Sequence, residues 1–173
     1  MSRLVLITGG ARSGKSGFAV TEAEKAGDKL VYIATATAED PEMEERIRKH
    51  KAERADGWET VEEPLDLVGA VKKITPERVI VIDCLTLWLT NMLMQNSEDF
   101  EDRAKAETIR LADVLKAYEG DVFVVSNEVG MGLVPENALA RLFRDAAGAV
   151  NRKMAEAADE VYLVVSGMPL KIK

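Results

Sequence analysis

The chain has 173 residues, 47% of them hydrophobic, which is enough apolar material for the core of one domain spanning residues 1–173. The formal net charge of -7 excludes general affinity for nucleic acid, because binding a polyanion over a whole surface requires positive potential. No apolar run approaches the roughly 20 residues that cross a bilayer, and no signal-peptide pattern opens the chain. We therefore expect a cytoplasmic protein without stable membrane insertion.

The first predicted strand covers residues 4–8, a short apolar run rich in β-branched residues. The segment after it fits the phosphate-binding pattern G-x-x-x-x-G-K-[ST], and a helix is predicted over residues 17–26. This order of strand, loop and helix is the context that the pattern requires. The phosphate loop so defined consists of Gly9, Gly10, Ala11, Arg12, Ser13, Gly14, Lys15 and Ser16.

The chemistry of this loop suits the phosphates of a nucleoside triphosphate. Its glycines permit a tight turn whose N–H groups face inward, reinforced by the positive end of the following helix. Lys15 is expected to reach the β- and γ-phosphates, and the Ser16 hydroxyl is expected to ligate Mg²⁺. The competing interpretation is a glycine-rich turn beside a surface lysine, which the preceding strand disfavours.

The rest of the chain alternates between apolar strands and helices. We predict strands over residues 30–34, 58–61, 78–83, 121–126, 160–165 and 170–173, helices over 41–55, 66–74, 103–118 and 135–158, and a loop over 96–102. Continuous apolar strands separated by helices are typical of a parallel sheet covered on both faces. We therefore predict an α/β fold, a single P-loop domain with a mainly parallel sheet, helices on both faces and a short C-terminal strand.

Ligands of such sheets bind beyond the carboxyl ends of the strands. This rule selects residues 8–16, 34–37 and 126–132 together with Asp83 as one rim. Asp83 ends an apolar strand, and its carboxylate is expected to hold Mg²⁺ from the side opposite Ser16. The alternative for Asp83 is an ordinary turn residue. Cys84, the single cysteine, is expected to be a small core residue rather than a nucleophile.

The only histidine, His50, lies in a strongly basic segment of an acidic chain. Lys51 and Arg54 fall within a turn of it on the predicted helix and could hold phosphate oxygens. A neutral imidazole is a good nucleophile near pH 7 and could attack a nucleotide α-phosphorus to form a phosphoramidate. The alternative is a solvated basic helix face with an incidental histidine, and the residues alone slightly favour this second interpretation.

Several tracts carry a resemblance to a known family along almost the entire chain. They are residues 8–16, 32–35, 46–51 with His50, 127–137, 157–161 and 164–167, and the Asn-Glu-Val-Gly-Met-Gly sequence of residues 127–132 is the most specific. The chain resembles the bifunctional adenosylcobinamide kinase and adenosylcobinamide-phosphate guanylyltransferase family of cobalamin biosynthesis.

The resemblance implies two reactions. In the first, the aminopropanol hydroxyl of adenosylcobinamide takes the γ-phosphoryl group of a nucleoside triphosphate. In the second, GTP transfers GMP to a histidine that corresponds to His50, and adenosylcobinamide phosphate takes the GMP to give adenosyl-GDP-cobinamide. Some relatives carry two histidines in tandem, whereas Lys49 precedes His50 here, which leaves open whether Lys49 takes over a contact.

The resemblance also implies a set of nucleotide contacts beyond the phosphate loop. These are Ala34, Thr35, Ala36, Lys51, Ala52, Glu53, Arg54, Glu62 and Asp83. Glu62 could accept hydrogen bonds from the guanine N1 and N2 groups, with a solvated strand end as its alternative. Some relatives carry Glu in place of Asp83, and both side chains can ligate Mg²⁺.

The family forms trimers, so the resemblance implies a homo-oligomer. The apolar residues 85–94 are consistent either with core burial or with a subunit contact. Two other functions stay open from the sequence: a kinase of a single activity acting on another hydroxyl substrate, and a non-catalytic GTP-binding switch. The switch is disfavoured because the chain lacks an Asn-Lys-x-Asp tetrad. The sequence leaves open whether ATP or GTP serves the kinase step and where the corrinoid docks.

Overall fold

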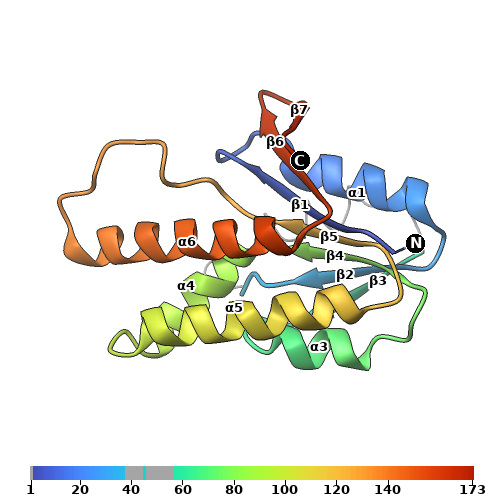
Figure 1. The fold of residues 1–173 in the computed structure, drawn as a ribbon, viewed down its shortest axis with the longest axis horizontal. Helices are drawn as coiled ribbons and strands as arrows, with labels where there is room; N and C mark the ends of the chain where they lie inside the picture. The colour runs from blue at the N-terminus through green and yellow to red at the C-terminus, as the bar shows by residue number, and fades with distance from the viewer. Residues whose placement is uncertain (1, 38–44, 46–56) are drawn as a thin grey trace.

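A seven-stranded sheet forms the centre of the molecule in the computed structural model, which describes residues 2–37, 45 and 57–173 (Figure 1). Its strands, in the spatial order β3-β2-β4-β5-β1-β6-β7, are β1 (Leu4–Gly9), β2 (Leu30–Ala34), β3 (Trp58–Glu62), β4 (Val79–Asp83), β5 (Val122–Val125), β6 (Glu160–Val165) and β7 (Met168–Lys171). Strand β7 runs antiparallel to β6, and the other neighbouring pairs are parallel. The predicted mainly parallel sheet with a short C-terminal strand is confirmed.

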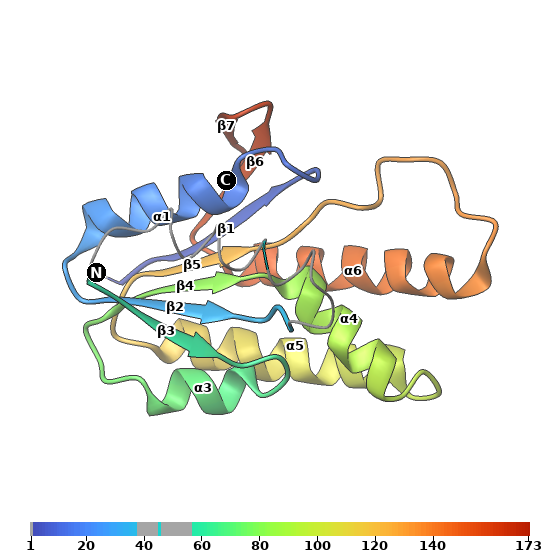
Figure 2. The same cartoon turned by 180° about the vertical axis from the view of Figure 1, so that it is seen from behind.

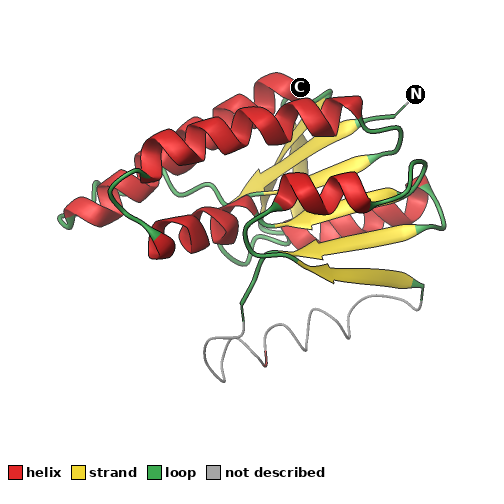
Figure 3. Cartoon of the chain, turned by 90° about the horizontal axis from the view of Figure 1, so that it is seen from below, coloured by secondary structure: helices red, strands yellow, loops and turns green. Residues whose placement is uncertain are grey.

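Helices cover both faces of this sheet, as predicted. They are α1 (Lys15–Ala26), α3 (Leu67–Lys73), α4 (Leu85–Gln95), α5 (Phe100–Ala117) and α6 (Ala138–Ala157). Helix α1 lies on one face, and α3, α4, α5 and α6 lie on the other (Figures 2 and 3). The helix predicted over residues 41–55 lies, apart from Glu45, outside the described residues. None of the helices in the described part of the chain is long and apolar enough to span a bilayer.

Strand alternation divides the apolar side chains into two cores. Successive side chains of a strand point to opposite faces of a sheet. Leu6 and Val124 therefore belong to the core beneath α4, α5 and α6, whereas Ile7 and Val125 belong to the core beneath α1. All six residues of β1 are buried, which explains why its first four residues, 4–7, are continuously apolar.

The predicted starts of four elements are wrong by two or three residues, and two of these differences have a clear physical cause. The predicted loop over residues 96–102 ends early, because α5 begins at Phe100, a fully buried ring that stacks on Phe143. Helix α6 begins at Ala138 rather than at residue 135, since the Asn137 side chain accepts a hydrogen bond from a backbone N–H of the first turn and so caps the helix there.

The other two boundaries differ without changing the architecture. Helix α1 begins two positions before the predicted start, at Lys15, so the last residues of the phosphate loop belong to its first turn. Strand β7 likewise begins two positions early, at Met168.

Helix α4 contains the apolar residues 85–94, for which the sequence left core burial and a subunit contact open. Its side chains Leu85, Trp88, Leu89 and Met92 are buried in the core of the same chain, and the Trp88 indole N–H donates to the Leu65 carbonyl at 2.7 Å. Core burial therefore accounts for this part of the apolar stretch.

Candidate active site

The phosphate loop joins the carboxyl end of β1 to the start of α1. The Lys15 side chain is buried, with 7% of its surface exposed, and its ammonium donates to the Gly10 carbonyl at 2.8 Å. The Ser13 N–H donates to the same carbonyl at 3.3 Å, which closes the turn. The loop thus folds back over the lysine and holds its ammonium at the carboxyl edge of the sheet.

Two glycines of the loop are required by close contacts. A Cβ atom on Gly9 would lie 2.4 Å from the Val164 carbonyl oxygen, so no larger residue fits there without displacing β6. Gly14 has φ of 96°, a left-handed conformation that favours glycine, and a Cβ on it would lie 3.3 Å from Gly167 Cα.

The turn between β6 and β7 contacts the phosphate loop and stabilises its position. The Gly167 N–H donates to the Ser13 carbonyl at 2.8 Å, which ties the loop to a segment far away in the chain. Sequence reasoning had noted residues 164–167 without giving them a role. A glycine after a strand is a weak signal by itself, because only the fold shows what the turn contacts.

The Ser13 hydroxyl is the one buried side-chain polar atom in the described residues that makes no hydrogen bond. A buried hydroxyl without a partner is costly, so a ligand oxygen at this position would be stabilising. Together with the N–H groups of the loop and the Lys15 ammonium, it forms a donor set suited to phosphate oxygens. The residues of the loop therefore fit a bound polyphosphate.

Asp83 is held at the same edge by a neighbour that the sequence did not reveal. The Tyr32 hydroxyl donates to Asp83 Oδ2 at 2.6 Å, and the Tyr32 ring packs edge-on against Trp58. In the ladder of the sheet, Ala34 pairs with Asp83 on one side and with Glu62 on the other. These three positions therefore lie side by side where β2, β3 and β4 end.

The oxygen donors at this edge fit Mg²⁺. Among the described residues, no group of three acidic, histidine or cysteine side chains gathers into a metal cage. Mg²⁺ bound with a nucleotide takes only one or two protein oxygens, and the remaining ligands are phosphate oxygens and water. The Asp83 carboxylate and the Ser16 hydroxyl, the latter in the first turn of α1, are of this kind.

Thr35 and Cys84 join the end of β2 to the start of α4. The Thr35 hydroxyl donates to the Cys84 carbonyl and accepts from the Cys84 N–H, both at 2.8 Å. The Asn91 amide donates to the Thr35 carbonyl at 2.8 Å and to the Pro64 carbonyl at 3.0 Å. The buried side chain of Thr35 is thus committed to the scaffold, and its contact with a nucleotide stays a prediction.

Burial determines the chemistry of Cys84. Removal from water, and secondarily the charge of Asp83, raise the pKa of the thiol to about 12. The thiol is therefore protonated and buried near neutral pH, which confirms that Cys84 is a core residue.

A buried polar network anchors the segment that follows β5. The Ser126 hydroxyl donates to Asn151 Oδ1 at 2.6 Å, and Asn151 Nδ2 donates to the Asn127 carbonyl at 3.0 Å. The Asn127 N–H donates to Thr86 Oγ1 at 2.7 Å. Asn151 lies on α6, and sequence reasoning missed it because a single amide on a long amphipathic helix gives no signal.

The structure brings the described members of the predicted site to one edge of the sheet. These are residues 9–16, Ala34, Thr35, Ala36, Glu62 and Asp83. The catalytic candidate His50 and the predicted contacts Lys51, Ala52, Glu53 and Arg54 lie outside the described residues.

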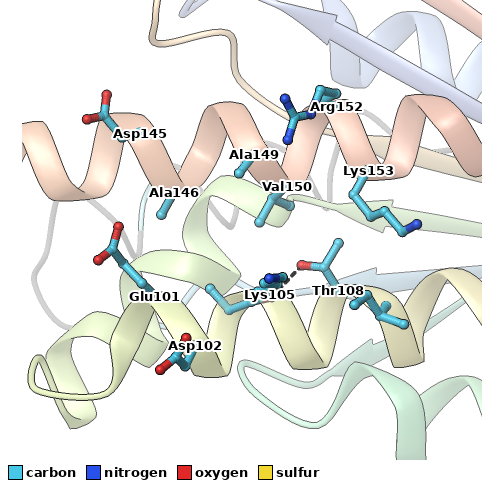
Figure 4. A pocket seen from close by; sticks show the side chains of 12 residues that line it. Glu101, Asp102, Lys105, Thr108, Asp145, Ala146, Ala149, Val150, Arg152 and Lys153 are labelled. Carbon is cyan, nitrogen blue, oxygen red and sulfur yellow. Dashed lines mark hydrogen bonds between the residues drawn. The ribbon is translucent and has the colours of Figure 1, made fainter.

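A separate pocket lies away from this edge, between α5 and α6. It has a volume of about 520 Å³, and Figure 4 shows charged side chains around its rim, among them Glu101, Lys105 and Arg152. Its buried Thr108 hydroxyl donates to the Ala104 carbonyl of its own helix at 2.6 Å. No member of the predicted site that the structure describes lines this pocket.

The fold and the phosphate loop define a P-loop nucleotide-binding protein. Solved structures of the same fold include the RadB recombinase, with a TM-score of 0.54, and an ATPase domain, with a TM-score of 0.53. Each shares 13% sequence identity with this chain and aligns with 93% of it, covering 73% and 68% of the respective structures. At this identity the likeness concerns the fold alone.

Sequence comparison identifies the family within this class. Residues 5–172 match the family model described as "Cobinamide kinase / cobinamide phosphate guanyltransferase". The "Bifunctional adenosylcobalamin biosynthesis protein CobP" of Pseudomonas aeruginosa is 42% identical over 97% of this chain and 96% of its own length. The CobU protein of Escherichia coli K12, which is also described as a bifunctional adenosylcobalamin biosynthesis protein, is 42% identical over 98% and 99%. The chain belongs to the cobinamide kinase / cobinamide phosphate guanyltransferase family.

Proposed function

We propose that this protein phosphorylates adenosylcobinamide on its aminopropanol hydroxyl and then transfers GMP from GTP to the phosphate so formed, through a guanylylated His50. The observation that carries the proposal is a complete phosphate loop with a buried lysine, in a chain that matches the family over nearly its full length. The product of the two steps is adenosyl-GDP-cobinamide.

The kinase step depends on positioning and charge neutralisation. The ammonium of Lys15 lies 2.8 Å from the Gly10 carbonyl, within the phosphate loop, and in the bound state it would donate to a γ-phosphate oxygen. The Ser13 hydroxyl and the N–H groups of the loop supply further donors. Mg²⁺, held by Ser16 and Asp83, would neutralise charge on the β- and γ-phosphates. Preorganised donors of this kind stabilise the transition state without reorganising as charge moves.

The transferase step adds covalent catalysis. The His50 imidazole would attack the α-phosphorus of GTP and expel pyrophosphate, and the phosphate of adenosylcobinamide phosphate would then displace the imidazole. Lys51, Ala52, Glu53 and Arg54 are the proposed GTP contacts of the same segment, and Glu62 is the proposed contact to guanine. Support for these roles comes from the family resemblance and from the nucleophilicity of a neutral imidazole near pH 7.

A mass measurement on the product tests the overall proposal. Adenosylcobinamide is incubated with the protein, Mg²⁺ and either GTP or ATP, and the corrinoid is weighed by mass spectrometry. We expect the corrinoid to gain the mass of one phosphate first and of GMP afterwards. The gain of GMP should occur when GTP is supplied and not when ATP is the only nucleotide. A gain of phosphate only would leave a kinase of a single activity, and no gain with either nucleotide would refute both reactions.

Labelling of the protein tests the role of His50. With GTP labelled at the α-phosphorus, we expect acid-labile, base-stable label on the wild-type protein and none on His50→Ala. Lys49→Ala is the matched control, because it changes the neighbouring cation and keeps the imidazole. Label that persists on His50→Ala would exclude this residue as the nucleophile.

We also propose that the protein is a homo-oligomer, a trimer by family resemblance. Several apolar side chains of the β5–α6 connection are exposed, with Met131 at 78%, Leu133 at 96% and Val134 at 65%. Large apolar side chains that cluster at a surface are typical of contacts between chains. Sedimentation at micromolar concentration tests this, and a clean monomer would contradict it.

A further inference from the structure

Strand β5 lies between the two strands that carry the phosphate loop and Asp83. It pairs with β1 on one side and with β4 on the other, and Asp83 is in register with Val125 (Figures 1 and 2). The residues that follow β5 therefore emerge between the phosphate loop and the proposed magnesium carboxylate.

The hydrogen-bond ladder continues beyond the end of β5. The Ser126 N–H donates to the Ile7 carbonyl at 3.0 Å, and the Glu128 N–H donates to the Gly9 carbonyl at 2.9 Å. This spacing of two residues is that of a parallel pair, so the side chains of residues 126–128 continue to alternate between the faces of the sheet.

The alternation directs Asn127 toward the phosphate-loop face. Val125 packs in the core beneath α1, and the Ser126 hydroxyl bonds to Asn151 of α6 on the other face. Asn127 then returns to the face of α1. Tyr32 lies in the core of this same face and bonds to Asp83.

The backbone of Asn127 is fixed, whereas its side-chain amide has no partner among the described residues. The N–H and the carbonyl are bound by Thr86 and Asn151, as described above. The side-chain amide of this half-buried residue makes no hydrogen bond to any residue that the structure describes. An oriented amide group with free donors is therefore available at this position.

We propose that the Asn127 amide donates a hydrogen bond to the transferring γ-phosphoryl group, an inference that rests on the kinase reaction proposed above. In that reaction the substrate hydroxyl oxygen bonds to the γ-phosphorus and the bond from γ-phosphorus to the bridging oxygen breaks. The nucleoside diphosphate leaves with the electron pair, and the hydroxyl proton passes to water. The amide stabilises the equatorial oxygens of the group in transit.

Two substitutions at this position distinguish a donor from a packing residue. Asn127→Ala removes the amide, and Asn127→Asp keeps its shape but replaces the donors with a negative charge. We expect kcat for cobinamide phosphorylation to fall about 100-fold in Asn127→Ala and at least as far in Asn127→Asp. In the presence of Mg²⁺, the Kd of a non-hydrolysable analogue of ATP or of GTP, whichever gives the higher phosphorylation rate, should change less than about threefold in Asn127→Ala, because the contact strengthens mainly in the transition state.

Asn96→Ala is the matched control, since Asn96 is an exposed asparagine at the end of α4 whose side chain accepts a hydrogen bond from the nearby Glu98 N–H. It should leave kcat and Kd unchanged. A kcat of Asn127→Asp within threefold of wild type, beside a low value for Asn127→Ala, would overturn the proposal in favour of packing. A wild-type rate in both variants would overturn it too, while the kinase function stands. A wild-type protein that forms no phosphorylated cobinamide would refute the proposed function itself before any variant is compared.

Discussion

Polar side chains gather both at the carboxyl edge of the sheet and in the pocket between α5 and α6, which we call the groove. The two places differ in how far these side chains are buried and bonded. At the edge, Lys15, Thr35 and Ser126 are buried, and each is bonded to a neighbouring element or to the loop itself. In the groove, the charged side chains of Glu101, Lys105 and others are exposed around an open space.

This difference bears on which of the two places is the better candidate for catalysis. Groups fixed by their neighbours can stabilise developing charge without reorganising, and partial burial strengthens their electrostatic interactions. Exposed charges on long side chains are screened by water and salt and lose entropy when a ligand orders them. The edge, with its fixed and buried groups, is therefore better suited to catalysis than the groove with its exposed charges.

The largest expected effect follows from removing the buried ammonium of the edge. Lys15→Met should lower the rate of γ-phosphoryl transfer by roughly 1,000-fold or more, because it removes a fixed charge beside the β- and γ-phosphates. Lys153→Met is the matched control in the groove and should keep the wild-type rate. Initial rates of phosphorylated cobinamide formation give both values. Full activity in Lys15→Met would remove the catalytic role of the phosphate loop.

A second expected effect concerns the protection of Cys84. Its pKa of about 12 keeps the thiol protonated at pH 8, so alkylation by iodoacetamide should be slower than in the unfolded protein by roughly 100-fold or more. Because folding raises the pKa of the thiol, the contribution of this group to folding stability is fully present at pH values below its pKa in the unfolded chain. The contribution is lost as the pH rises toward 12. Mass spectrometry of the folded protein and of the protein in denaturant measures the two rates. Equal alkylation rates in the folded and the denatured protein would show that Cys84 is not protected by the fold.

Substitution of Tyr32 tests whether the orientation of the Asp83 carboxylate affects the rate and its dependence on Mg²⁺. Tyr32→Phe keeps the buried ring and removes the hydroxyl that donates to Asp83 Oδ2. We expect the rate at saturating nucleotide to fall about tenfold and the Mg²⁺ concentration for half-maximal rate to rise, as for other residues that orient a metal ligand. Titration of the initial rate with Mg²⁺ checks this. A reduced rate with an unchanged Mg²⁺ dependence would contradict it.

The smallest effect is expected in the groove. Lys105→Ala and Arg152→Ala, combined in one protein, should change neither the phosphorylation rate nor the guanylylation of the protein by more than about twofold, as is usual for exposed charges. Both side chains are exposed, and none of the predicted site residues within the described ranges 2–37 and 57–173 lines this groove. Loss of either activity in a variant that unfolds at the wild-type temperature would show that the groove takes part in the reaction.

Local patterns in the sequence determined the phosphate loop, the strands and the position of Asp83. The loop is contiguous, and its glycines and lysine have the spacing that a phosphate requires. The central strands β1 and β5 are largely apolar because both of their faces are buried. Helix α4 (Leu85–Gln95) had not been assigned as a helix from its apolar sequence. The other errors were at element ends such as those of α5 and α6, where a buried Phe100 and a capping Asn137 decided the boundary.

Only the tertiary structure decided which distant groups support the loop and the carboxylate. The contacts of Tyr32 with Asp83, of Gly167 with Ser13 and of Asn151 with Ser126 join segments that chain spacing does not relate. The same is true of Asn127, whose direction follows from the pairing of β5 with both β1 and β4. A sequence pattern records the period of a strand or helix, whereas the order of strands within the sheet arises from packing of the whole chain.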